Sequence, residues 1–169
     1  RLRALSGTWL FKKEASVRAL VATALGRIDD PASIPFLIEQ LRDADNQVRR
    51  SAAAALEGSS AQLDDASVAR LISHFEADAD APARYNLLRA LGNARLDGSR
   101  EFLRDTLRTA TYSFRPHVAL ALAIDGDPGN AAFLLAALEH PVNGIRRRAR
   151  VELSEHDSAE VIAATELWL

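Results

Sequence analysis

A nine-residue pattern that returns at a nearly fixed interval constrains the fold of this chain more than any other feature. The pattern begins with an apolar residue and an arginine, continues through small residues and ends in leucine, as in Val48 to Leu56 (VRRSAAAAL). Copies begin at residues 17, 48, 83, 114 and 145, so successive copies start 31, 35, 31 and 31 residues apart. A period of this size is typical of proteins built from stacked supersecondary units.

A second pattern falls between these copies and keeps the same spacing. It reads Phe-Leu-x-x-x-Leu and begins at residues 36, 102 and 133, with a degraded copy at 71 and fainter copies at 5 and 164. Both patterns place apolar residues three, four and seven positions apart, which predicts one-sided amphipathic helices. The longest interval carries four extra residues within Glu57 to Ser67, a polar stretch that we expect to form a surface loop.

The two patterns together predict an alternation of A helices and B helices. We expect A helices over residues 1–11, 31–42, 65–76, 98–110, 129–139 and 158–169, and B helices over 15–26, 46–57, 81–92, 114–124 and 144–154. Gly26 and Gly92 suit the left-handed position that follows the end of a helix. Three aspartates that precede proline or glycine are expected to cap the next helices: Asp30, Asp97 and Asp127.

The composition agrees with closely packed helices and excludes several kinds of site. Hydrophobic residues make up 48% of the 169 residues, and the frequent Ala favours helices whose backbones approach closely. The chain has no Cys, which excludes disulfides, thiolate metal ligands and cysteine nucleophiles. A formal net charge of −2 gives no global field that favours nucleic acid or an anionic membrane.

No apolar run approaches the roughly 20 residues that a membrane span needs. We therefore expect no membrane association and a cytoplasmic location. Lysine occurs only at Lys12 and Lys13, whereas arginine and alanine are abundant. This usage hints at a GC-rich, bacterial coding source.

These patterns resemble the HEAT repeat. Asp45 to Leu56 carries Asp-x-x-Val-Arg-x-x-Ala-x-x-Ala-Leu, and Gly26 to Leu41 carries the glycine and the Asp-Pro-x-x-x-x-x-Leu that follow it. The closest variety is the bacterial HEAT-like repeat named after phycobilin lyases. The resemblance covers the whole chain and implies an all-α fold, an α-α superhelix of about five helix pairs in one domain over residues 1–169. It implies no single function, because this scaffold serves many purposes.

Arginine occupies the second place in every B-helix pattern: Arg18, Arg49, Arg84, Arg115 and Arg146. The resemblance implies an aspartate six residues before this arginine, and a ladder of such pairs along the stack. The aspartate is present as Asp43 and Asp78, whereas the other copies have Lys12, Thr109 and His140. We expect the arginines to brace loops, through aspartates or the carbonyl groups of the preceding A helix. Direct contact with a ligand is the alternative.

The sequence shows no recognisable catalytic or metal-binding motif. It has no phosphate-binding glycine loop, no nucleophile elbow and no His-Glu-x-x-His. The four histidines lack metal-ligand spacing: His74, His117, His140 and His156. The acidic stretches Glu76 to Asp80 and Asp64 to Asp65 fall at turns and suit caps or hinges better than a calcium loop. We therefore predict no catalytic residue, metal or cofactor, although the sequence leaves enzymatic activity open.

The resemblance also indicates where a partner would bind. The B helices of HEAT-type solenoids line the concave face, which is the usual binding surface. Places one, five, eight and nine of the pattern are expected to be buried, and places three, six and seven to turn outward. The predicted partner-binding residues follow from those places and their neighbours: Arg50, Tyr85, Arg89, His117, Arg147, Arg148 and Arg150. The alternative is an arginine-rich face that is merely solvated, since acidic residues follow closely at Glu152 and Glu155.

Two tryptophans occupy equivalent places near the two ends of the chain. Trp9 and Trp168 stand where the copies between them have Gln40, Phe75, Thr106 and Ala137. Ordinary packing explains them, and the alternative is extra apolar surface for end-to-end self-association of the terminal helices. Both ends of the sequence fall inside an A-helix pattern without a polar cap, which favours an excised segment or such a contact.

The leading hypothesis is a non-enzymatic scaffold that binds a protein partner with an acidic surface on the concave face. A bilin-lyase-like enzyme or accessory protein is an alternative that the resemblance suggests, although no residues identify a pigment pocket. A second alternative is a binder of the nucleic-acid backbone, as in HEAT-like DNA glycosylases. Tyr85 is the only aromatic residue that we can place in the groove. Nucleic acid is therefore the less favoured partner.

Overall fold

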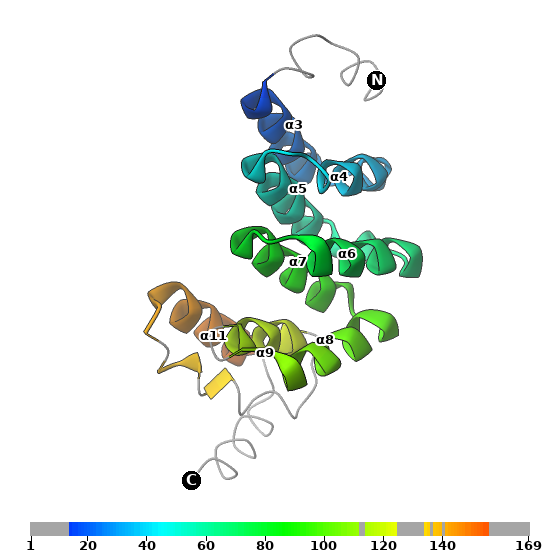
Figure 1. Ribbon diagram of the computed structural model, residues 1–169. Helices are drawn as coiled ribbons and strands as arrows, with labels where there is room; N and C mark the ends of the chain where they lie inside the picture. The colour runs from blue at the N-terminus through cyan, green and yellow to red at the C-terminus, as the bar shows by residue number, and fades with distance from the viewer. Residues whose placement is uncertain (1–13, 112–113, 125–133, 136, 140, 156–169) are drawn as a thin grey trace.

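The helices alternate between two layers (Figure 1). The computed structural model describes residues 14–111, 114–124, 134–135, 137–139 and 141–155. The B layer contains α3 (Ala15–Ile28), α5 (Asn46–Gly58), α7 (Ala81–Ala94), α9 (Arg115–Ile124) and α11 (Asn143–Glu155). The A layer contains the 3-10 turn η1 (Pro31–Ser33) with α4 (Ile34–Gln40), followed by α6 (Asp65–Ala77) and α8 (Asp97–Thr109). The fold is an all-α solenoid, as the repeats predict.

The predicted helix bounds are confirmed to within two residues for these eight helices, provided that η1 is counted as the first turn of the helix expected over 31–42. The two patterns explain this accuracy, because they recur with the same spacing and each copy helps to fix the helix bounds of the others. The A helices expected over 1–11 and 158–169 lie outside the described residues, together with Trp9 and Trp168. Most of the A helix expected over 129–139 lies outside them as well. None of the described helices is long and apolar enough to cross a membrane.

Each described B helix packs against the next B helix, and α5, α7 and α9 also pack against the A helices that precede them, α4, α6 and α8. Large apolar side chains from both layers fill the interface and are fully buried, including Leu37, Leu56, Leu71 and Leu103. Place six of the pattern was predicted to turn outward, and this prediction is wrong for Ala22, Ala53, Leu88 and Ala119, which are buried. A B helix inside the stack has neighbours on three sides, so its buried face is wider than that of a simple amphipathic helix.

The prediction that Gly26 and Gly92 follow helix ends is wrong. Both lie inside α3 and α7, and the left-handed residues are Asp29 (φ 53°) and Arg95 (φ 55°). A Cβ atom at Gly26 would lie 2.7 Å from the Cα of Ala55, and one at Gly92 would lie 2.2 Å from the carbonyl oxygen of Ala121. These glycines are therefore required because neighbouring B helices touch through their backbones.

The predicted caps have mixed outcomes. The side chain of Asp30 accepts a hydrogen bond from the N–H of Ala32, which confirms it as a cap with proline after it. Asp97 is already the first residue of α8, whose N-cap is Leu96, so its assignment as a cap is wrong. Asp127 lies outside the described residues.

The segment predicted as a surface loop is partly buried. Residues Ser60–Gln62 form the 3-10 turn η2, and Ser59, Ser60 and Leu63 are almost inaccessible to solvent. The side-chain amide of Gln62 donates a hydrogen bond of 3.3 Å to the carbonyl oxygen of Asp29. The insertion therefore packs one side against its neighbours, while Ala61, Gln62 and Asp64 stay exposed as a surface loop predicts.

Candidate functional site

The edge where each A helix turns into its B helix carries a repeated Asp-Ala-Asp sequence, at residues 43–45 and 78–80. The first aspartate accepts the backbone N–H of the second at 2.9 Å in both copies. The second aspartate is the N-cap of the following B helix: Asp45 caps α5 and Asp80 caps α7. Both oxygen atoms of the first aspartate also face the preceding repeat.

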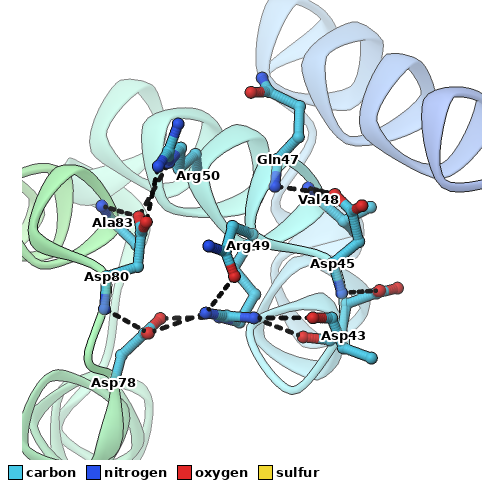
Figure 2. Close-up of polar contacts among 11 residues, drawn as sticks. Asp43, Asp45, Gln47, Val48, Arg49, Arg50, Asp78, Asp80 and Ala83 are labelled. Carbon is cyan, nitrogen blue, oxygen red and sulfur yellow. Dashed lines mark hydrogen bonds and ion pairs between the residues drawn. The ribbon is translucent and has the colours of Figure 1, made fainter.

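Arginines from the preceding B helix meet these aspartates. Arg18 on α3 binds both carboxylate oxygens of Asp43, at 2.6 and 2.9 Å. Arg49 on α5 binds both oxygens of Asp78, at 2.8 and 3.0 Å. Figure 2 shows Arg49 between Asp78 and the loop of its own repeat, where it also donates to the carbonyl oxygens of Asp43 and Ala44. The ladder thus joins Arg18 and Arg49 to the aspartate of the next repeat.

The pairs are poorly exposed and mutually stabilising. The side chains of Arg49 and Asp78 are 16% and 10% exposed. Burial alone would raise the pKa of Asp78, but the hydrogen bonds from Arg49 and from the N–H of Asp80 hold that pKa below its usual value. The pKa of Asp43 is lowered in the same way, by Arg18 and the N–H of Asp45, against the opposing effect of burial. Both carboxylates are thus held in the charged form.

A second pair runs beside the ladder between α5 and α7. Arg50 binds both oxygens of Asp80, at 2.9 and 2.7 Å, while the same carboxylate caps α7 through the N–H of Ala83 (Figure 2). Further along the same two helices, Arg89 forms an ion pair with Glu57. Two of the predicted partner-binding residues, Arg50 and Arg89, therefore join neighbouring B helices.

The ladder changes character at the next junction. Thr109 replaces the expected aspartate, and the guanidinium carbon of Arg84 lies over the ring faces of Phe75 and Phe114, at 4.3 and 4.6 Å from their centroids. Phe75 also meets Phe102 edge to face, with ring centroids 5.4 Å apart. Attraction between the cation and the aromatic faces replaces the carboxylate here.

Tyr85 and His117 lie together at the same junction. Their rings are stacked, with centroids 3.7 Å apart and planes inclined by 17°. Tyr85 also contacts Phe114 at 4.9 Å. Both side chains are half-buried. Among the described interactions, this is the one contact between two of the predicted partner-binding residues.

A family model of HEAT repeats matches residues 5–57 and 68–154. This chain is a HEAT-repeat protein. The unmatched residues between the two parts coincide with the insertion around η2, which interrupts the regular period. None of the curated proteins matches the chain. The phycobilin-lyase variety of the repeat stays a prediction.

The helix α11 carries the remaining predicted residues of this HEAT-repeat chain. Arg147 and Arg150 are exposed, and neither makes an ion pair with any residue that the structure describes. Arg148 lies in α11, but its side chain is outside the described part. Arg146, at the ladder place, donates to the carbonyl oxygen of Pro141 at 2.8 Å. The cationic surface of α11 is therefore less engaged in pairing than that of α5 and α7.

The prediction that the ladder arginines brace loops is confirmed for Arg18, Arg49 and Arg146. Arg84 braces aromatic rings instead, and the side chain of Arg115 is exposed. The residues that sequence reasoning missed are the partners Asp80 and Glu57. The duplicated Asp-Ala-Asp was the available signal for Asp80. Within the described residues, no group of His, Asp or Glu is arranged to hold a metal ion.

Proposed function

We propose that this HEAT-repeat protein is a non-enzymatic scaffold whose B layer binds a protein partner on the face turned away from the A layer. HEAT repeats commonly mediate protein–protein interaction, and the B helices form the usual binding surface of such solenoids. The charged and apolar side chains on this face differ from one B helix to the next, and α11 offers the strongest binding surface for a partner.

The observation that carries this proposal is the combination of charge and apolar surface on one side of α11. Arg147, Arg150 and Val151 are spaced three and four residues apart, so they share one face of the helix. All three are exposed, and Val151 retains 46% of its accessible surface. Arginine beside aliphatic surface is typical of binding interfaces, because the guanidinium supplies directional bonds and the aliphatic neighbour excludes water.

The centre of the B layer supports a partner that is acidic and compact rather than a long polyanion. Arg50 and Arg89 already hold Asp80 and Glu57, so their charges are largely neutralised within the protein. A nucleic-acid backbone would need a continuous run of cations along the groove. On α11, Arg147 and Arg150 are exposed and form no ion pair with the residues that the structure describes, which favours an acidic patch on a folded protein.

Capture of partners from cells of the natural source tests this function. The double variant Arg147→Glu with Arg150→Glu reverses the charge on α11, and Arg70→Glu with Arg108→Glu makes the same change on the A layer. A specific partner should be retained by the wild-type protein and by the A-layer control, and its affinity for the α11 variant should fall about tenfold or more. Equal loss with both variants, or loss with neither, would contradict binding on α11. Capture of duplex DNA with strong salt dependence would replace the proposal with nucleic-acid binding.

A further inference from the structure

Each rung of the ladder pairs a B-helix arginine with an aspartate of the next repeat. The third rung, at Arg84, lacks the aspartate carboxylate that completes the first two. Arg18 and Arg49 each form two hydrogen bonds to an aspartate of the next repeat. Arg84 occupies the same place in α7, and the residue that should supply its carboxylate is Thr109. The hydroxyl of Thr109 instead points back to its own helix, at 3.5 and 3.4 Å from the carbonyl oxygens of Asp105 and Thr106.

The aromatic surroundings of Arg84 satisfy its charge but not its hydrogen-bonding groups. Its guanidinium carbon lies over the rings of Phe75 and Phe114, and such faces attract a cation without offering lone pairs to its five N–H donors. The Nε atom of Arg84 is buried without a hydrogen-bond partner in the structure. No ion pair joins Arg84 to any of the described residues. Arg84 therefore lacks the planar, doubly accepting group that Arg18 and Arg49 each bind.

We propose that Arg84 is a docking point for a carboxylate side chain of a partner protein, which completes the third rung from outside. The place of Thr109 is the place from which Asp43 and Asp78 bind their arginines, so a carboxylate there meets the fork of the guanidinium. The half-buried rings of Tyr85 and His117 pack near Phe114, the ring that lies under the guanidinium of Arg84, so aromatic surface adjoins the site.

This inference rests on the proposed function, since it names a chemical group of the bound partner. The two can nevertheless fail separately. The charge reversal on α11 leaves Arg84 unchanged, and a substitution at Thr109 leaves the arginines of α11 unchanged. A partner could thus be held by α11 without using Arg84, and the experiment below detects that outcome.

The decisive variant is Thr109→Asp, which places a carboxylate of the protein itself in the third rung. It should raise Tm by about 2–4 °C, the shift expected for one added ion pair in a chain of this size. The probe is the peptide N-acetyl-Glu-Glu-Glu-Glu-amide, with the corresponding Gln peptide as its neutral control. The readout is the Nε–H resonance of Arg84 in the full chain, assigned by its loss in Arg84→Gln.

The proposal expects this resonance to shift with the Glu peptide and not with the Gln peptide. The shift should disappear in Thr109→Asp and persist in Thr109→Asn, which has the same shape without the charge. Affinity for the Glu peptide should fall about tenfold in Arg84→Gln, as expected for the loss of a charge-assisted contact. The proposal is overturned if the resonance does not move, or if it moves equally in Thr109→Asp. Shifts confined to Arg147 and Arg150 would overturn it while leaving the proposed function intact.

Discussion

Two neighbouring junctions of this solenoid are held by different physical means. Between α5 and α7, Arg49 and Arg50 bind Asp78 and Asp80, so that charge-assisted hydrogen bonds fix one repeat on the next. Between α7 and α9 the arginine is retained as Arg84, but aromatic rings take the place of the carboxylate. The same helical repeat is therefore kept at both junctions, although ion pairs with carboxylates join the repeats at one of them and aromatic rings replace the carboxylate at the other.

Both kinds of junction share one requirement, which is the close approach of B-helix backbones. Gly26 approaches Ala55 and Gly92 approaches Ala121, where a Cβ atom would overlap backbone atoms. Overlap with backbone is costly because a helix cannot move aside as a flexible side chain can. The largest effects of substitution are therefore expected at these glycines, whatever chemistry the junction uses.

Gly92→Ala should cause the largest loss of stability. The added Cβ would lie 2.2 Å from the carbonyl oxygen of Ala121, so α7 and α9 must separate. We expect the free energy of unfolding in urea to fall by about 3 kcal/mol. Gly98→Ala is the matched control, because nothing lies within 4 Å of its new Cβ atom. That control should be neutral or slightly stabilising, and an equal loss in both variants would show that close packing is not the cause.

Removal of the arginine should lower the free energy of unfolding by different amounts at the two junctions. Arg49→Met leaves Asp78 charged and poorly exposed without its partner, which should lower the free energy of unfolding by about 2 kcal/mol. Arg84→Met removes a cation from two ring faces and should cost about 1 kcal/mol. A double-mutant cycle with Asp78→Asn checks that the first loss comes from the pair. A larger loss for Arg84→Met than for Arg49→Met would reverse our ranking of the junctions.

Acid should weaken the carboxylate junctions before the aromatic one. The pKa values of Asp43 and Asp78 are lowered from 3.8 in the folded protein, so their stabilisation is complete above that value. It is lost as pH falls through 3.8 and then through the lower folded values, because protons then bind the unfolded chain preferentially. Amide protection factors, which correct the exchange rate for its intrinsic dependence on pH, should therefore fall first in α3 and α5 between pH 5 and pH 3. The variant Asp43→Asn with Asp78→Asn should flatten this dependence, and an unchanged profile would contradict it.

Most of the fold was predictable because five copies of one pattern determine a common phase. The ends of α5 and α6 could be predicted within one residue, and the buried leucines follow from helical periodicity. The roles of Gly26 and Gly92 could not, because glycine after Ala-Leu is equally suited to a helix end and to a close helix contact. Only the position of the neighbouring helix distinguishes the two, and that information lies about 30 residues away in the chain.

The site was less predictable, because the partner of each arginine also depends on the position of the neighbouring repeat. The sequence indicated which arginines turn away from the A layer, but a solvated arginine and an arginine paired with the next repeat have the same local pattern. Arg50 was predicted to bind a partner, and its side chain binds Asp80 of the next repeat. The pairing of Arg49 with Asp78, rather than with the aspartate six residues before it, required the geometry between repeats.

The smallest effect is expected at Arg50, because its side chain is 39% exposed whereas that of Arg49 is 16% exposed. Arg50→Ala should lower the free energy of unfolding less than Arg49→Met, and added salt should reduce the difference from the wild-type protein. Asp80 retains its cap to the N–H of Ala83 in this variant, which limits the loss further. Urea unfolding at low and high salt measures both parts of the prediction.

The same variant also tests whether a partner binds the centre of the B layer or α11. Arg50 must leave Asp80 before it can bind a partner, whereas Arg147 is exposed and forms no ion pair with the described part of the chain. Arg50→Ala should therefore reduce partner capture less than Arg147→Glu with Arg150→Glu. Complete loss of capture in Arg50→Ala, with stability unchanged, would show that the partner opens the pair with Asp80. The binding face would then extend across α5 as well as α11, and exposure in the free protein would be a poor guide to it.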